Sequence, residues 1–109
     1  MNTNVKAYGA KSATADLEPM SIERRETKPS DVKIEITYCG VCHSDIHTVR
    51  NDWQNSVYPV IPGHEIIGKV LEVGENVTKF KKDQLVGVGC LVDSCQTCSS
   101  CDEGLEQYC

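Results

Sequence analysis

The chain has 109 residues, with 11 Lys and Arg against 16 Asp and Glu and a formal net charge of -5. This length suits one domain. The acidic balance argues against a nucleic-acid surface and against an anionic membrane, because both need clustered Lys and Arg. Cysteine is abundant, with seven, whereas large aromatic core residues are scarce, with one Phe and one Trp.

The first half of the chain has strand character. Strands are expected near 5–9 and 17–25. Val32, Ile34 and Ile36 alternate with polar residues. This period of two predicts a half-buried strand, because successive side chains of a strand point to opposite faces.

The elements that follow are separated by proline and glycine. Residues 42–53 are polar and compatible with a short helical turn, and the prolines of 58–62 favour an extended segment. Strands are expected over 66–73, where Gly68 indicates a bulge or a close backbone approach, and over 84–90. Short strands with such turns favour a mainly β, barrel-like or sandwich core.

The cysteines are expected to be reduced. No apolar run near the N-terminus is long enough for a secretory signal, and nowhere do about 18 apolar residues follow one another. We therefore expect a soluble, cytoplasmic protein without membrane contact. In that compartment a cysteine cluster more often binds a metal or performs chemistry than forms disulfides, and an odd count indicates the same.

The strongest motif is a run of four cysteines within a cysteine-rich lobe, 91–109. Its spacing is Cys95-x2-Cys98-x2-Cys101-x7-Cys109. Four thiolates close a tetrahedral shell around zinc, which predicts a structural site that replaces an apolar core. An iron–sulfur cluster is a rival interpretation, although the bacterial run has a gap of three before its last cysteine and a proline after it. Disulfides are the other alternative.

A second group offers ligands of mixed chemistry. Cys42 and His64 supply a sulfur and an imidazole nitrogen, whereas a catalytic zinc typically takes three protein ligands. Asp45 and Glu65 are carboxylates suited to orienting a ligand, and Glu65 could itself bind the metal. Gly63 would set the turn that aims His64 inward, because glycine tolerates unusual backbone angles.

The residues of 42–47 also have plainer, structural interpretations when each is taken alone. His47 could be a surface histidine, Ser44 a helix cap and Cys42 a small buried side chain. Cys39 and Cys90 match no ligand position, and we expect both to be buried thiols. The residues alone therefore leave the second site open.

Three motifs in this order resemble the zinc-containing alcohol dehydrogenases of the medium-chain dehydrogenase/reductase superfamily. They are the four-cysteine spacing of 95–109, Gly40-Val41-Cys42-His43-Ser44-Asp45 and Gly63-His64-Glu65-x2-Gly68-x5-Gly74-x2-Val77. The surrounding sequence is similar to the cinnamyl-alcohol-dehydrogenase-like branch, whose members reduce aldehydes with NADPH. The resemblance implies a mainly β, GroES-like barrel-type catalytic domain over 1–109, with the structural zinc lobe at 91–109 inside it.

The resemblance also implies roles for single residues. Cys42 and His64 would bind the catalytic zinc, with Glu65 close behind or transiently bound, and Asp45 would hydrogen-bond His64. The structural zinc would take Cys95, Cys98, Cys101 and Cys109.

The remaining implied roles concern proton transfer and binding. Ser44 would bond the alcohol, and His47 would pass its proton towards solvent through the cofactor ribose. His43 would face the cofactor pyrophosphate, and Trp53 would line the substrate pocket. The implied ligands are zinc at two sites, NADP(H) in the full-length protein and a small alcohol or aldehyde, and the family is often homodimeric.

The sequence departs from a complete enzyme of this family. The third zinc ligand, a downstream cysteine, and the Rossmann domain with its G-x-G-x-x-G motif are absent. We therefore expect the N-terminal piece of a roughly threefold longer protein, inactive by itself. The alternative is a free-standing zinc-binding interaction module. A zinc-lacking quinone-reductase relative would not need Cys42, His64 and the lobe cysteines together.

Overall fold

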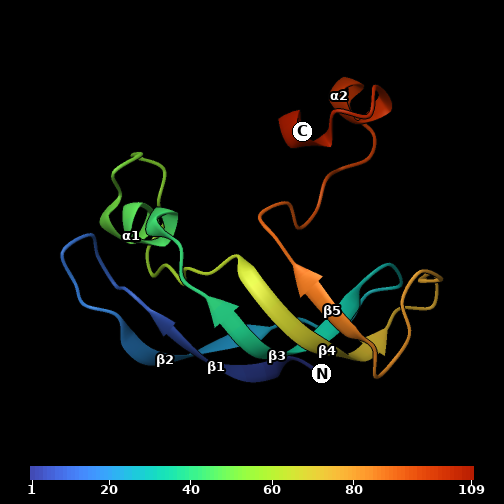
Figure 1. Ribbon diagram of the computed structural model, residues 1–109, viewed down its shortest axis with the longest axis horizontal. Coiled ribbons are helices and arrows are strands. Elements are labelled where there is room, and N and C mark those ends of the chain that lie inside the picture. Colours follow the sequence, from blue (N-terminus) through green and yellow to red (C-terminus); the bar gives the residue numbers. More distant parts are fainter.

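The computed structural model describes residues 1–109 and is built from two antiparallel sheets (Figure 1). Strands β1 (Thr3–Gly9) and β2 (Glu18–Arg24) form the first sheet. Strands β3 (Val32–Gly40), β4 (Glu65–Val73) and β5 (Leu85–Val88) form the second sheet in the order β3-β4-β5. The expectation of a mainly β chain is confirmed, with each predicted strand present within a few residues of its expected bounds.

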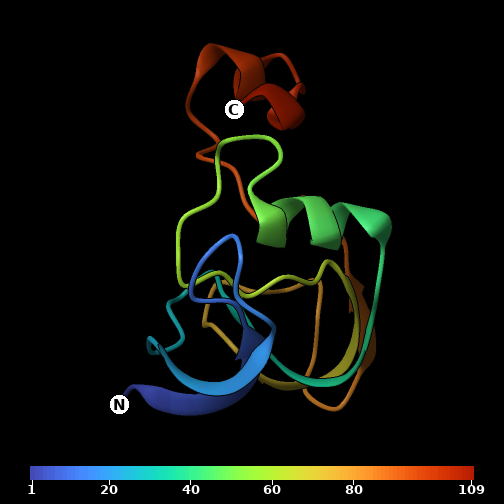
Figure 2. The same ribbon diagram turned by 90° about the vertical axis from the view of Figure 1, so that its left-hand side faces the viewer.

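The helices are short. They are α1 (His43–Arg50), α2 (Ser99–Asp102) and the 3-10 helix η1 (Glu106–Tyr108). Figure 2 shows α1 above the strands and the C-terminal lobe farther out on the same side. The helices lack the length and apolar character that crossing a bilayer requires.

Helix α1 confirms the helical turn expected within 42–53, and its two ends explain its bounds. Cys42 precedes it in an extended conformation, and the Asp45 carboxylate accepts the Cys42 backbone N–H at 2.9 Å. Asn51 ends it in the left-handed conformation at φ 60°, where its N–H reaches the carbonyls of the last turn. The helix therefore begins at the candidate ligand Cys42.

Strands β3 and β4 pair with two register shifts. One shift leaves Leu71 of β4 as an extra residue, and the other does the same for Thr37 of β3. Gly68 lies beside the second shift, and a Cβ there would be 2.5 Å from the Glu35 carbonyl oxygen. The close backbone approach predicted at Gly68 is confirmed.

The core of the chain is small. Its buried apolar residues are Ala10, Val49 and Val70. The accessible surface is 8444 Å², against about 6,000 Å² for a compact protein of this size. The radius of gyration is 15.5 Å, where about 13 Å is typical. Large apolar side chains are therefore exposed, including those of Tyr38, Val41, Trp53, Val57 and Leu85.

Three burial predictions are wrong. Ile36 was expected on a buried face but is 56% exposed, because its partner across the sheet is Gly68, which offers no side chain to cover it. Cys39 and Cys90 are exposed rather than buried. Cys39 lies at the open end of β3, and Cys90 follows β5 in the irregular segment that leads to the lobe.

The turn between β2 and β3 is held by a carboxylate. Asp31 accepts the Lys28 backbone N–H at 2.8 Å and two hydrogen bonds from the Arg25 guanidinium, one of them at 3.2 Å. These bonds, that of Arg25 first, lower the pKa of Asp31 to about 2. The carboxylate therefore stabilises the turn in its ionised form.

We expect the chain to expose apolar surface in solution. The excess of roughly 2,400 Å² is larger than the about 800 Å² that each partner buries in a standard interface. The purified chain should therefore bind an apolar-surface dye such as ANS and self-associate at micromolar concentration, as measured by fluorescence and sedimentation. A monomer that binds no dye at any concentration would contradict this expectation.

Replacing Asp31 with Asn should lower the melting temperature in a pH-dependent way. The folded-state pKa lies below the unfolded value, so the carboxylate contributes stability above about pH 4, and this contribution is lost as the pH falls through about 2. Thermal unfolding of both proteins should show a difference at pH 7 that disappears between pH 4 and pH 2. A difference that stays constant over this range would show that Asp31 acts without its charge.

Candidate metal centres

The first candidate centre lies where α1 and β4 begin. Cys42 precedes α1, and His64 and Glu65 stand at the start of β4. Their sulfur, nitrogen and oxygen atoms all lie within 4.8 Å of one another. Gly63 turns the chain just before His64 with φ 128°, so the unusual backbone predicted for it is confirmed. The structure thus brings Cys42 together with His64 and Glu65, which lie 22 and 23 positions further along the sequence.

The Asp45 carboxylate contacts both segments of this centre. Its Oδ1 lies 3.2 Å from His64 Nδ1, and its Oδ2 accepts the Cys42 backbone N–H at 2.9 Å. Asp45 is only 9% exposed. With Nδ1 engaged, the Nε2 atom of His64 is available for a ligand, which is the arrangement that carboxylates give to metal-binding histidines.

The electrostatics of this centre without a metal favour the thiolate form of Cys42 and the protonated form of His64, which must release its proton before it binds a metal. The Ser44 hydroxyl donates to Cys42 Sγ at 3.3 Å. The Ser44 hydroxyl and backbone N–H, followed by His64, lower the pKa of Cys42. The Cys42 thiolate, followed by the Asp45 carboxylate, raises the pKa of His64. A thiolate, an imidazole and a carboxylate form a donor set that fits zinc.

The remaining predicted residues lie along the same helix and just beyond it. The His47 ring is 4.8 Å from that of His43 and 5.2 Å from that of Trp53, measured between centroids. His43 and Trp53 are both exposed. Sequence reasoning missed Asp52, whose Oδ2 lies 2.8 Å from His47 Nδ1. Its only sequence signal is an acidic residue five positions after a histidine, which is common on solvated surfaces.

The second candidate centre is formed by the four lobe cysteines, Cys95, Cys98, Cys101 and Cys109. Their sulfur atoms lie within 4.8 Å of one another. The Sγ atom of Cys101 is 3.5 Å from that of Cys98 and 4.0 Å from that of Cys95. Four sulfurs at the usual zinc–sulfur distance of about 2.3 Å would be about 3.8 Å apart. The cluster therefore fits a tetrahedral zinc.

The lobe thiols have unequal acidities without a metal. The backbone N–H of Thr97, its side chain and the N–H of Cys98 lower the pKa of Cys95 to about 6. The Cys95 N–H acts to lower the pKa of Cys109, but the neighbouring thiols outweigh it and raise the value to about 11. Four adjacent thiolates repel one another, so a divalent cation is needed to bring all of them into the ligand form.

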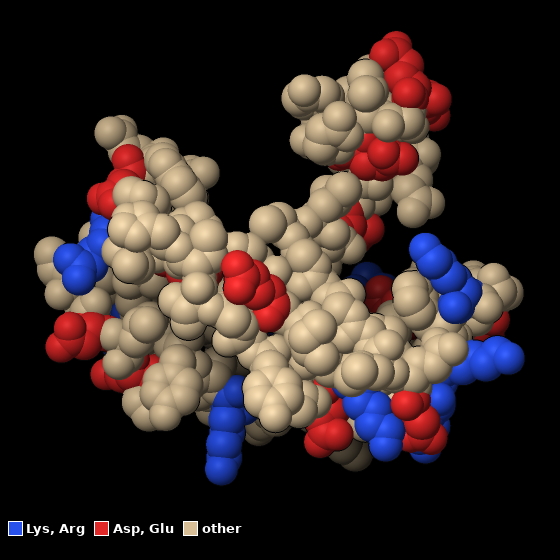
Figure 3. Space-filling view, in the orientation of Figure 1, with Lys and Arg blue, Asp and Glu red and all other residues tan.

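The lobe is also the most acidic part of the chain. Residues 91–109 contain no Lys or Arg, whereas they contain four acidic residues: Asp93, Asp102, Glu103 and Glu106. In Figure 3 the lobe at the upper right shows acidic atoms and no basic ones. Such a field attracts cations. Among the helices and strands, α2 contacts only η1, so the thiols hold together a lobe that lies away from the sheets (Figure 1).

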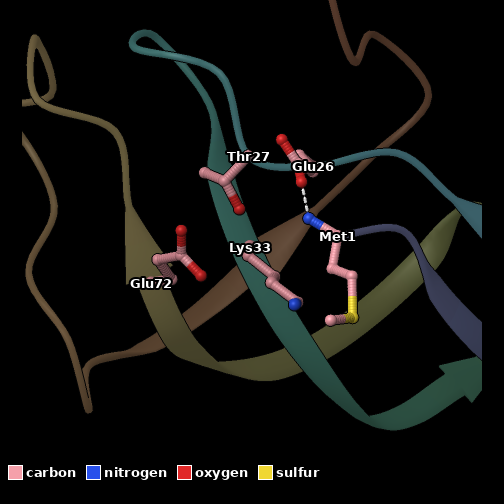
Figure 4. A pocket seen from close by; sticks show the side chains of 5 residues that line it. All are labelled: Met1, Glu26, Thr27, Lys33 and Glu72. Atoms are coloured by element: carbon pink, nitrogen blue, oxygen red, sulfur yellow. Dashed lines mark ion pairs between the residues drawn. The ribbon is translucent and has the colours of Figure 1, made fainter.

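Two surface hollows lie outside the two groups of ligand residues, and one of them borders the lobe. One of about 210 Å³ is lined by Met1, Glu26, Thr27, Lys33 and Glu72 (Figure 4). Its N-terminal amine is paired with Glu26. The other, of about 250 Å³, is lined by Leu91, Val92, Asp93, Ser94, Gln96 and Glu106. Neither hollow is lined by Cys42, His64, Glu65 or one of the four lobe cysteines.

Comparison with known proteins identifies the family that the three sequence motifs resemble. The model of the alcohol dehydrogenase GroES-like domain matches residues 28–109. The aldehyde reductase YahK of Escherichia coli is 61% identical over 105 residues, which are 96% of this chain and 30% of that protein. The chain therefore spans less than a third of this relative.

Solved structures agree in fold as well as in sequence. A cinnamyl alcohol dehydrogenase from Sorghum bicolor is 47% identical with a TM-score of 0.92, over 98% of this chain and 30% of that one. The cinnamyl alcohol dehydrogenase of Helicobacter pylori, complexed with NADP(H), is 45% identical with a TM-score of 0.94, over 100% and 31%. This chain thus belongs to the alcohol dehydrogenase GroES-like domain family, in the branch of zinc-containing medium-chain dehydrogenases that includes the cinnamyl alcohol dehydrogenases and YahK.

Proposed function

We propose that this chain supplies part of the catalytic centre of a zinc-dependent, NADP(H)-linked enzyme that interconverts small alcohols and aldehydes. The observation that carries the proposal is the convergence of Cys42, His64 and Glu65, with Asp45 holding the first two. The names of the relatives support the reaction and the cofactor, since one is an aldehyde reductase and another binds NADP(H). Because the chain spans about 30% of these relatives, the activity is proposed for the whole protein.

Zinc would be held by Cys42 Sγ and His64 Nε2, with the Glu65 carboxylate beside them. When bound there, zinc supplies a Lewis acid that stabilises negative charge on the substrate oxygen. Asp45 fixes the orientation of the His64 ring, and the Ser44 hydroxyl and backbone N–H lower the pKa of Cys42 and so favour its thiolate form. The family's third ligand, a cysteine, would come from outside these residues.

The proton leaves through residues of α1. The Ser44 hydroxyl accepts the proton of the alcohol and passes it outward. His47 would exchange this proton with solvent, because an imidazole gains and loses protons near neutral pH, and the cofactor ribose would lie between Ser44 and His47. Asp52 holds His47 Nδ1 at 2.8 Å and thereby presents Nε2 to the relay. His43 would contact the cofactor pyrophosphate, and the exposed Trp53 would line the substrate pocket.

The lobe has a separate, structural role in this proposal. Its four thiolates would fill every position of a tetrahedral zinc, leaving none for a substrate. The lobe contains few apolar residues, and Leu105 and Tyr108 are both exposed. The metal would therefore order 91–109 in place of a core, over a segment that belongs to the same catalytic domain.

The two centres should bind zinc independently. Reconstituted under reducing conditions, the chain should hold two zinc ions, measured by mass spectrometry in native buffer. Replacing Cys42 with Ser should remove one ion and replacing Cys98 with Ser the other. The alternative function is a zinc-binding interaction module. Such a module would bind a single zinc ion, which would be lost in Cys98→Ser and retained in Cys42→Ser.

Activity can be tested in a chimera with YahK, in which this chain replaces the matching 30% of that enzyme. The chimera should reduce aldehydes with NADPH, and the 109-residue chain alone should not. His64→Ala should abolish the activity. His47→Gln should lower kcat by about 100-fold, the usual contribution of acid–base catalysis, and flatten its pH profile.

The controls for the chimera separate chemistry from folding. Lys82→Gln changes an exposed residue without a proposed role and should leave kcat unchanged. Asp52→Asn should retain part of the activity, because it leaves His47 in place but loosens its ring. Full activity of the His64→Ala chimera would refute the proposed function.

A further inference from the structure

Gly40 and Glu65 face each other where β3 ends and β4 begins. Their Cα atoms are partners in the antiparallel register. Residues directly opposite in such a pair point their side chains to the same face, with Cβ atoms about 5 Å apart. The Glu65 side chain therefore shares the space above Gly40.

The Glu65 carboxylate occupies the place of a side chain at position 40. A Cβ added to Gly40 would lie 3.1 Å from Glu65 Cβ and 3.4 Å from Cδ, and it would overlap with Oε2. The same carboxylate lies within 4.8 Å of the ligand atoms of Cys42 and His64. The space left by Gly40 is thus the space from which Glu65 reaches the candidate metal.

Gly40 is not needed for its backbone conformation. The glycines with positive φ are Gly63 and Gly104, and Gly40 is not among them. An alanine can therefore adopt the backbone of position 40. The atom that it would overlap is the end of a flexible side chain, and the Glu65 Cβ at 3.1 Å would have to shift by a few tenths of an ångström. Gly40→Ala should leave the sheet intact and push the carboxylate aside.

The other glycines of this sheet behave differently. A Cβ on Gly68 would meet the backbone carbonyl of Glu35 at 2.5 Å, so that substitution would disturb the sheet itself. A Cβ on Gly87 would meet its nearest atoms at 3.5 and 3.6 Å, which is ordinary contact. Among these three, only Gly40 makes room for a functional group, and Gly87 offers a matched control.

We propose that Gly40 is a positioning residue that keeps the Glu65 carboxylate beside the metal held by Cys42 and His64. This inference rests on the proposed metal site. Displacing the carboxylate removes a negative charge and a donor from the neighbourhood of the ion. Losing such a supporting group typically weakens metal binding by about tenfold or more.

The test is a titration of the chain with Co²⁺, whose thiolate and d–d absorption bands report binding. Absorption that remains in Cys42→Ser belongs to the lobe and serves as an internal reference. At the Cys42-dependent site, Gly40→Ala and Glu65→Ala should each weaken Co²⁺ binding by about tenfold. Gly87→Ala should bind Co²⁺ like the wild type. Without metal, Gly40→Ala, Glu65→Ala and Gly87→Ala should each have a melting temperature within a few degrees of the wild-type value.

The double variant decides how Gly40 acts. If Gly40 works only through the carboxylate, Gly40→Ala should add nothing in the Glu65→Ala background. A further tenfold loss there, or wild-type binding by Gly40→Ala alone, would overturn the inference and leave the proposed function standing. If the wild-type chain shows no Cys42-dependent Co²⁺ binding, this inference fails, whereas the proposed function is decided separately by the activity of the chimera.

Discussion

The Asp45 carboxylate joins the two chain segments that carry the first candidate centre. One oxygen accepts the N–H of Cys42 and so begins helix α1, and the other lies 3.2 Å from His64 Nδ1 ahead of β4. The group is nearly buried, so losing it would leave polar partners without hydrogen bonds inside the protein, which is costly. The start of a helix, the approach to a strand and the orientation of a ligand therefore depend on a single side chain. Fold and site are stabilised together here.

The features predicted well from the sequence are those with a local cause. Alternating side chains mark the strand that begins at Val32, and the spacing of Cys95, Cys98 and Cys101 brings thiols together over a few residues. The pairing of Gly40 with Glu65 depends instead on register, which two shifts between β3 and β4 alter. Sequence patterns do not reveal such shifts.

One side chain that was predicted wrongly and one that was overlooked also show that sequence patterns do not reveal spatial partners. Ile36 has the right period for a buried face but stands opposite a glycine, so its exposure follows from its partner and not from its own type. Asp52 was not singled out from the sequence. It reaches His47 because Asn51 reverses the chain in the left-handed conformation, and the Asp52 N–H bonds back to the His47 carbonyl at 3.0 Å.

The two carboxylates of the first centre, those of Asp45 and Glu65, have different roles because their surroundings differ. Asp45 is buried and committed to two partners, so it can hold a ligand but cannot leave its place. Glu65 is exposed and rests over a glycine, so it can approach or leave an ion at small cost. A four-sulfur shell such as that of the lobe has no position to spare, whereas a centre that binds and releases substrate needs one. In the proposed zinc site, a movable carboxylate beside a fixed thiolate and imidazole would meet that need.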